Sequence, residues 1–381
     1  MALVTFACFT DITAYSIAVP VLPDLSRRLG ASPTMIGFLF ASFGVTLLTV
    51  SVPMGAVSDR IGRRAPMVGG LVALAAATLL FASAASLPVL FVARLVQGAA
   101  DAITWVVGFA LIADRYAADE RGRVTGVVMS GTSFAFMIGP SIGGWLYEIG
   151  GIRLPFLFVT GLAVVSAISF LLIDLPPAHS EHEAVPLKTV LRVPAVAVCT
   201  IAVVAASATM SMLEPVLALH LASLSIGPAR IGLLFGVAAA LSAILHPGVG
   251  HLADRLGARR MMILGLSLSS FALALAGQSW SFASAVALQL PLVVTIAFMI
   301  TPSLAYMGEA TSLSGAPSFG VAYGLYNMAW GVGLLGGPAI GGFLFERLGF
   351  SRLSVAWAPA LLLITWLLAG VQSRSPKEEN V

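Results

Sequence analysis

The stretch LVTFACFTDITAYSIAVPV, residues 3–21, is an apolar run that carries Asp11 at its middle and Pro20 near its end. A run of about 20 apolar residues is long enough to cross a bilayer as a helix. A carboxylate inside such a helix costs about 2.5–3.5 kcal/mol to insert, and therefore indicates a functional role with a cation or a proton as its partner. A second acid, Glu214, lies 203 residues later (214 − 11), just before Pro215 in another apolar run. We expect the two acids to face one central cavity, around which the other helices are arranged.

The composition predicts an all-α integral membrane protein. The 381 residues are 59% hydrophobic and only 10% charged, whereas soluble domains carry about 25% charged residues. The first apolar window lacks the basic flank and the cleavage pattern of a signal peptide, so we expect a retained helix. Apolar windows of about 20 residues predict twelve transmembrane helices, near residues 3–22, 34–53, 66–84, 89–113, 124–147, 154–174, 195–220, 230–250, 260–278, 281–307, 319–345 and 353–371.

The distribution of basic residues predicts the orientation of these spans. With both termini in the cytoplasm, thirteen Lys and Arg residues fall on cytoplasmic segments, six on external segments and one within a span. Cytoplasmic segments of membrane proteins carry the excess of Lys and Arg, so both termini are predicted to be cytoplasmic. This explains the basic balance without nucleic-acid binding. Richness in Ala, Gly, Val and Arg favours a bacterial inner (plasma) membrane.

Two landmarks that recur predict an internal duplication. Asp59 and Asp254 are 195 residues apart, within similar loop sequences. The sequence GPSIGGWLYE at residues 139–148 returns as GPAIGGFLFE at residues 337–346, 198 residues later. Repeats of six spans each have the same orientation in the membrane, so we predict two six-helix bundles, related as parallel repeats, around a central cavity.

The one long polar stretch separates the two repeats. We expect an N-terminal bundle at 1–174, a cytoplasmic linker at 175–193, a C-terminal bundle at 194–373 and a disordered tail at 374–381. The linker contains His179 and His182. No further ligands cluster near these histidines, so a solvated linker is favoured over a metal site, and no metal site is predicted elsewhere.

Four motifs give the chain a resemblance to the major facilitator superfamily of transporters. Residues 55–64 resemble that superfamily's loop between the second and third spans, and residues 94–98 resemble its fourth-span arginine motif. Residues 135–144 are similar to the fifth-span signature of the drug/proton antiporter branch, and residues 333–342 repeat its spacing. The resemblance covers the whole chain and implies alternating access by rocking of two bundles.

A narrower resemblance is to the vesicular monoamine and acetylcholine transporters and their bacterial relatives. It rests on Asp11 followed by Pro20, on DERG at 119–122, on LYE at 146–148 and on LEP at 213–215. The chain departs from that pattern at Phe43, where those transporters have a lysine, and at Asn327, where they have an aspartate. It also has no acid in the first part of the tenth span.

Two groups of residues are predicted to act in gating. Acids and arginines at the ends of the second and eighth spans can pair with each other or with a helix end, and so lock one conformation. Glycine–proline pairs in the fifth and eleventh spans allow close helix approach and bending. The alternatives are a positive-inside anchor for the first group and helix packing alone for the second. The predicted gating residues are Asp59, Arg60, Arg63, Asp254, Arg255, Gly139, Pro140, Gly337 and Pro338.

Four charged residues within spans are candidates for proton coupling: Asp11, Glu214, Arg94 and Asp101. In a partly dehydrated cavity a carboxylate favours a proton, and a cationic amine competes for the same carboxylate, which is the basis of antiport. The alternative is structural, with an acid permanently paired with Arg94. Asp101 lies seven residues after Arg94 on one helix face, and we expect it to neutralise Arg94 in preference to joining the proton path.

Aromatic residues on the spans expected to line the cavity can hold a cation or a flat ring. The alternative for each is packing against the core or against lipid. Trp105 and Phe136 are among the aromatic candidates for the cavity wall. Together with the two acids, the predicted substrate-binding set is Asp11, Glu214, Asn327, Tyr15, Phe43, Phe134, Tyr323, Tyr326 and Trp330.

We therefore predict a monomeric, proton-coupled antiporter that exports organic cations or lipophilic amines, as a multidrug or monoamine-like carrier. Its partners are the substrate, protons and membrane lipids. It needs no cofactor beyond the proton gradient, since the sequence has no phosphate-binding Gly–Lys loop. The alternative is a facilitator or proton symporter of a neutral small metabolite in which Asp11 is structural. A receptor would need large soluble domains, and an intramembrane enzyme a nucleophile–base or metal set; the sequence favours neither.

Overall fold

The computed structural model describes residues 1–116, 118–173, 194–312 and 319–370, and its elements are helices. The first part of the chain forms α1 (Ala2–Ser16), the 3₁₀ turn η1 (Val19–Val21), α2 (Leu22–Leu29), α3 (Pro33–Ile61), α4 (Arg64–Ser83), α5 (Leu87–Arg115), α6 (Ala118–Gly150) and α7 (Arg153–Leu172). The second part forms α9 (Pro194–Ser223), α10 (Pro228–Leu256), α11 (Ala258–Ala276), α12 (Phe282–Ser312) and α13 (Phe319–Gly370).

The described part of the chain contains eleven helical stretches long and apolar enough to cross a membrane. The last of them, Gly324–Gly370, has 47 residues, about twice the length that a bilayer requires. Gly349, with a φ of 73°, bends α13 within this stretch. Counting α13 as two spans gives twelve, and the prediction of an all-α integral membrane protein is confirmed.

The first span is not one regular helix over residues 3–22. Instead, α1 ends at Ser16, η1 contains Pro20, and α2 continues to Leu29. Proline lacks an amide N–H and its ring clashes with the preceding turn, which breaks a helix at this point. The residues of α2 beyond the apolar run include Asp24, which pairs with Arg28 at 2.5 Å.

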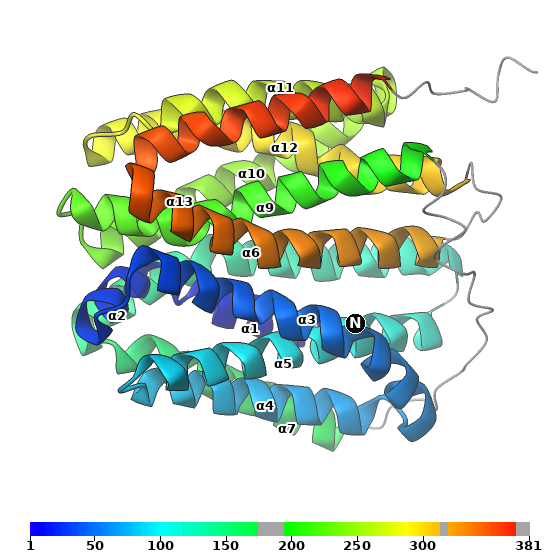
Figure 1. Ribbon diagram of the computed structural model, residues 1–381. Helices are drawn as coiled ribbons and strands as arrows, with labels where there is room; N and C mark the ends of the chain where they lie inside the picture. Colours follow the sequence, from blue (N-terminus) through cyan, green and yellow to red (C-terminus); the bar gives the residue numbers. More distant parts are fainter. Residues whose placement is uncertain (117, 174–193, 313–318, 371–381) are drawn as a thin grey trace, which may run out of the picture.

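The two ends of the helix bundle are distinct in Figure 1. At the left lie α2 and the bend of α13, and we name this end the α2 side. The last turn of α13 lies at the other end, and we name this end the terminal side. Helices α3, α6, α10 and α13 each run between these two ends.

Two helix pairs make most of the contacts between residues 2–172 and residues 194–370: α3 lies against α13, and α6 lies against α10. Both pairs use the same contact. A Cβ added at Gly37 of α3 would collide with the carbonyl oxygen of Pro338, and one added at Gly232 of α10 with that of Pro140. Because only glycine permits such close backbone approach, the duplicated glycines place the two parts of the chain together in a symmetric way.

The predicted domain boundaries stay a prediction. The linker at 175–193 and the tail at 374–381 lie outside the described residues.

Candidate functional site

Asp11 is buried between α1 and α5. Its side chain is 1% exposed, and its Oδ2 accepts a hydrogen bond from Nε1 of Trp105 at 3.1 Å. The other oxygen, Oδ1, has no donor among the described residues. Asp101 of α5, also buried, is a close neighbour of Asp11. Two neighbouring carboxyl groups repel each other when both are ionised, so this arrangement suits a site that exchanges protons.

Arg94 lies in an aromatic cage. Its guanidinium carbon is 4.7 Å from the ring centroid of Tyr15, 4.2 Å from that of Phe40 and 5.2 Å from that of Phe43. Its Nη1 donates to Oε1 of Gln97 at 2.6 Å. Cation–π contacts with three rings thus stabilise the guanidinium in this desolvated site.

That Asp101 neutralises Arg94 stays a prediction. No ion pair to Arg94 is found among the described residues, although the charges of Asp101 and Glu214 both act on its guanidinium. Asp101 also lies near Asp11. The alternative of a permanent ion pair between Asp11 or Glu214 and Arg94 is likewise not found in this part of the chain.

A hydrogen bond between Tyr15 and Glu214 joins the two halves at the centre. The Tyr15 hydroxyl donates to Oε2 of Glu214, on α9, at 2.5 Å. The Tyr15 ring meets Phe43 edge-on at 5.1 Å between centroids, and Phe136 at 6.3 Å. Tyr15 thus links Phe43 and Arg94 of the first half to Glu214 of the second half. That Asp11 and Glu214 face one central cavity stays a prediction.

Three other predicted binding residues with described side chains, Phe134, Tyr326 and Trp330, make their ring contacts elsewhere. Phe134 is half exposed and stacks on Phe9 at 6.2 Å between ring centroids. Of these two rings, that of Phe9 lines an open pocket of about 460 Å³, together with Met1, Ala2, Thr5, Phe6, Val127 and Gly131.

Tyr326 and Trp330 of α13 stack on each other at 6.0 Å between ring centroids. The Ser303 hydroxyl donates to the Tyr326 hydroxyl at 3.3 Å. Asn327 is exposed, and the side chain of Tyr323 lies outside the described residues. In the part of the chain that the structure describes, no hydrogen bond, ion pair or ring contact joins Tyr326 or Trp330 to Tyr15 or Glu214.

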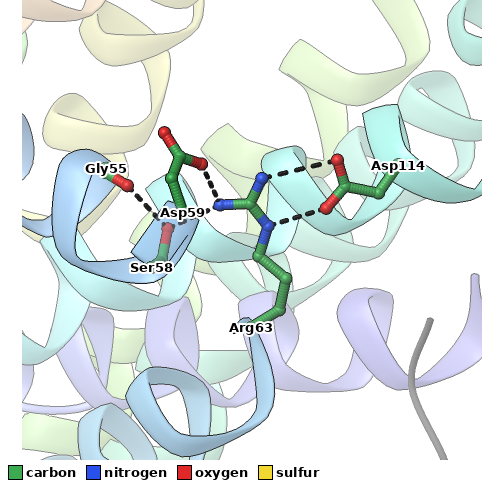
Figure 2. A network of polar contacts seen from close by, with 5 residues as sticks. All are labelled: Gly55, Ser58, Asp59, Arg63 and Asp114. Atoms are coloured by element: carbon green, nitrogen blue, oxygen red, sulfur yellow. Dashed lines mark hydrogen bonds and ion pairs between the residues drawn. The ribbon is translucent and has the colours of Figure 1, made fainter. Parts of the chain in front are cut away.

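A charged network at the terminal side ties the end of α3 to α5, as Figure 2 shows. Arg63 donates to Asp114 through Nε at 2.7 Å, and to Asp59 through Nη1 at 2.5 Å. Nη1 also donates to the Ser58 hydroxyl at 2.7 Å, which in turn donates to the Gly55 carbonyl at 2.9 Å. Burial by itself would lower the pKa of Arg63, but the bonds to Asp114 and Asp59 outweigh it and raise that pKa above its ordinary value. The guanidinium is therefore charged at every physiological pH.

The other predicted gating residues occupy two kinds of position. Arg60, Asp254 and Arg255 are exposed at the terminal side. The glycine–proline pairs are buried at helix crossings: Gly139 lies against Ser16, and the carbonyls of Pro140 and Pro338 lie against glycines of the opposite half. Gly337 packs on Ala208 of α9. Gating roles for all of these residues stay a prediction.

Sequence reasoning gave no role to Phe40 and Gln97, and it named Trp105 only as a candidate for the cavity wall, not as a partner of Asp11. Helical spacing carried a signal for Gln97 and Trp105. Gln97 follows Arg94 by three residues and Trp105 follows Asp101 by four, so each shares a face of α5 with a charged residue. Phe40 had no such signal, because its contact with Arg94 joins two separate helices.

A bundle of membrane-spanning helices that brings buried acids together from both parts of the chain is the arrangement of a secondary transporter. Residues 4–208 and 199–381 match the family model of the Major Facilitator Superfamily, and the chain belongs to that family. The predicted assignment is confirmed, and the protein is a transporter and not an enzyme.

Curated relatives and solved structures agree with this assignment. The chain is 27% identical to the vesicular acetylcholine transporter of Drosophila melanogaster, over 93% of this chain and 68% of the relative. It is 28% identical to the chromaffin granule amine transporter of Homo sapiens, over 91% of this chain and 67% of the relative. The fold is similar to that of a bacterial homolog of the human lysosomal transporter Spinster, with a TM-score of 0.83 at 13% identity, over 97% of this chain and 95% of that chain.

Proposed function

We propose that the protein is a proton-coupled antiporter that exports organic cations or lipophilic amines by rocker-switch alternating access. The observation that carries this proposal is Asp11: a carboxylate buried within a span, with one oxygen that has no donor among the described residues. A buried carboxylate without a cation is costly, so it binds either a proton or a cationic amine. The two cannot occupy it together, and this competition couples their movements in opposite directions.

Glu214 extends the same argument to the second half of the chain. Its hydrogen bond from Tyr15 links the helix that carries Asp11 to α9. A proton or an amine that binds Glu214 competes with this bond, so loading of the site alters a contact between the two halves. This is the coupling of occupancy to rocking that an alternating-access carrier requires.

The relatives support the choice of cargo. Two of them are named as transporters of acetylcholine and of chromaffin granule amines, and both cargoes carry a cationic nitrogen. The positive-inside rule supports cytoplasmic termini, so that the α2 side faces outward. We propose the bacterial inner membrane as its location, a monomer as its working state, and protons and membrane lipids as its other partners.

The test is uptake of a labelled lipophilic amine into proteoliposomes under an imposed pH gradient. Asp11→Asn and Glu214→Gln should each lower gradient-driven uptake by about 100-fold or more, because a buried charge pair is worth about 3–5 kcal/mol. The matched control is Asp24→Asn, an acid of α2 that pairs with Arg28, and it should transport normally. Uptake that neither substitution changes would contradict the proposal.

Tyr15→Phe tests the link between the halves. The change keeps the ring that packs on Arg94 and Phe43 and removes only the hydroxyl that donates to Glu214. A hydrogen bond to a charged group is worth about 1.5–3 kcal/mol. We expect gradient-driven uptake to fall by roughly 10- to 100-fold, measured in the same proteoliposomes. Unchanged uptake would show that the Tyr15–Glu214 bond plays no part in transport.

A second candidate function is a facilitator or symporter of a neutral metabolite, in which Asp11 is structural. The bond from Trp105 to Asp11 favours it, because a neutral donor can hold a carboxylate in place without any cargo. Gradient-independent movement of the substrate, together with normal transport by Asp11→Asn, would select this alternative.

A further inference from the structure

Two glutamates at the α2 side reach across from one half of the chain to the other. Oε2 of Glu346, on α13, accepts a hydrogen bond from the backbone N–H of Thr34 at 2.9 Å. Oε1 of Glu148, on α6, accepts one from the backbone N–H of Ala229 at 3.2 Å. Thr34 and Ala229 are each the second residue of a helix, α3 and α10 respectively. We name these two contacts the reciprocal caps.

The two reciprocal caps are equivalent contacts, related by the internal repeat. Thr34 and Ala229 are 195 residues apart, and Glu148 and Glu346 are 198 residues apart. These are the offsets of the internal repeat. Each half of the chain therefore supplies one acceptor and one helix start to the other half.

The chemistry of each cap is favourable only when the halves are close on this side. The first N–H groups of a helix have no partner within the helix, and the helix dipole places partial positive charge there. A carboxylate satisfies both the donor and the charge. The adjacent backbones pack tightly: Gly342 lies against the Pro33 carbonyl, and Gly144 against the Pro228 carbonyl. Opening of the α2 side would remove both carboxylates from both helix starts.

We infer that Glu148 and Glu346 are gate residues, and that the reciprocal caps hold the α2 side of the transporter closed. The proposal rests on the rocking motion of the proposed function but not on the nature of the cargo or on proton coupling. Loss of the caps shifts the equilibrium toward the state that is open at the α2 side and closed at the terminal side.

The experiment measures both sides of the molecule at once, in lipid nanodiscs without substrate or gradient. Two spin labels at Arg27 and Arg352, exposed residues on opposite halves, report the separation at the α2 side. A second pair at Ile61 and Leu256, which are 62% and 44% exposed, reports the terminal side. Pulsed dipolar spectroscopy then gives the populations of short and long distances for each pair.

Removing a capping side chain costs about 1 kcal/mol, which corresponds to about a fivefold change in an equilibrium. We expect Glu148→Ala and Glu346→Ala each to raise the ratio of open to closed states at the α2 side about fivefold, and the double variant about 25-fold if the caps act independently. The isosteric changes Glu148→Gln and Glu346→Gln remove only the charge and should give smaller shifts in the same direction. The distance at the terminal side should shorten in step.

Glu120→Gln is the matched control, because Glu120 is an exposed glutamate on the same helix as Glu148 but near its other end. It should leave both distance distributions unchanged. Distributions that stay unchanged in the Ala variants would overturn the proposal. A longer distance at the α2 side with an unchanged terminal side would also overturn it, since that pattern is local fraying and not gating. The proteoliposome uptake assay tests amine antiport separately, so a failure of the proposed function is distinguishable from a failure of the gating proposal.

Discussion

The loop after α3 and the loop after α10 have nearly the same sequence and backbone, yet only one of them contains a buried ion pair. Asp59 and Asp254 occupy equivalent positions, and Gly62 and Gly257 both have a φ near 90°, at 88° and 91°. In the first loop Arg63 joins Asp59 to Asp114. In the second loop the position 195 residues after Arg63 is Ala258, which is buried.

The next position, in contrast, is an arginine with the same role in both loops. Arg64 donates to the carbonyls of Phe170 and Leu171, at the end of α7. Arg259, 195 residues later, donates to the carbonyl of Leu368, near the end of α13. Each arginine thus satisfies carbonyls at the C-terminal end of the last helix of its own half, where the helix dipole also favours a cation.

The comparison shows that the duplicated motif contains two independent arginine interactions. The arginine that binds helix-end carbonyls, Arg64 or Arg259, is common to both halves and stabilises the packing within each half. The arginine that joins α3 to α5 is present only in the first half, so at the terminal side the loop after α3 is anchored more firmly than the loop after α10. The predictions below test this distinction.

The largest expected effect is that of Arg63→Ala. The side chains of Arg63 and Asp114 are 4% and 5% exposed, so the change leaves a buried carboxylate without its cation. Breaking a buried pair in this way costs about 3–5 kcal/mol of unfolding free energy, measured by denaturant or thermal unfolding in detergent. Arg255→Ala, at an exposed position of the second loop, is the control and should stay within about 0.5 kcal/mol of wild type. Equal losses in the two variants would remove the distinction between the loops.

A smaller and symmetric effect is expected for the two helix-end arginines. Arg64→Ala and Arg259→Ala should each lower the unfolding free energy by about 1–2 kcal/mol, from hydrogen bonds to carbonyls and from the helix dipole. The two losses should agree within about 0.5 kcal/mol, the scatter expected of independent sites. Unfolding measurements on the two variants side by side check this. A large loss in one alone would show that the halves do not share this interaction.

The smallest effect is expected for the two aspartates. Asp59 is 45% exposed in its pair with Arg63, and exposed pairs contribute about 0.2–1 kcal/mol. Asp59→Asn should therefore lower stability slightly, and the loss should shrink as salt is added, because salt screens exposed charges. Asp254→Asn should change stability by no more than a few tenths of a kcal/mol. A salt-sensitive loss at Asp254 would instead indicate a partner there.

The offsets of 195 and 198 residues connected most of these paired positions before any coordinates were considered. The same offsets relate the reciprocal caps. The sequence showed Glu148 and Glu346 as the last residues of the repeated motif but gave them no role, because an acid at a helix end has no distinctive pattern. Their partners lie 81 and 312 residues away. Contacts of this kind depend on which helices are neighbours, and periodicity along one helix contains no such information.

The sequence by itself determined the number of spans, the duplication and the residues that must have partners. The cost of placing a charge in a bilayer makes Asp11, Arg94 and Glu214 conspicuous in any apolar run. Only the tertiary structure decided which residues contact these charged side chains. Asp101, which was expected near Arg94, is also a neighbour of Asp11, and Arg94 contacts three aromatic rings and Gln97. A helix sequence fixes which side chains share a face, whereas the rotation of each helix against its neighbours, set by packing of glycines such as Gly37 and Gly232, decides what that face meets.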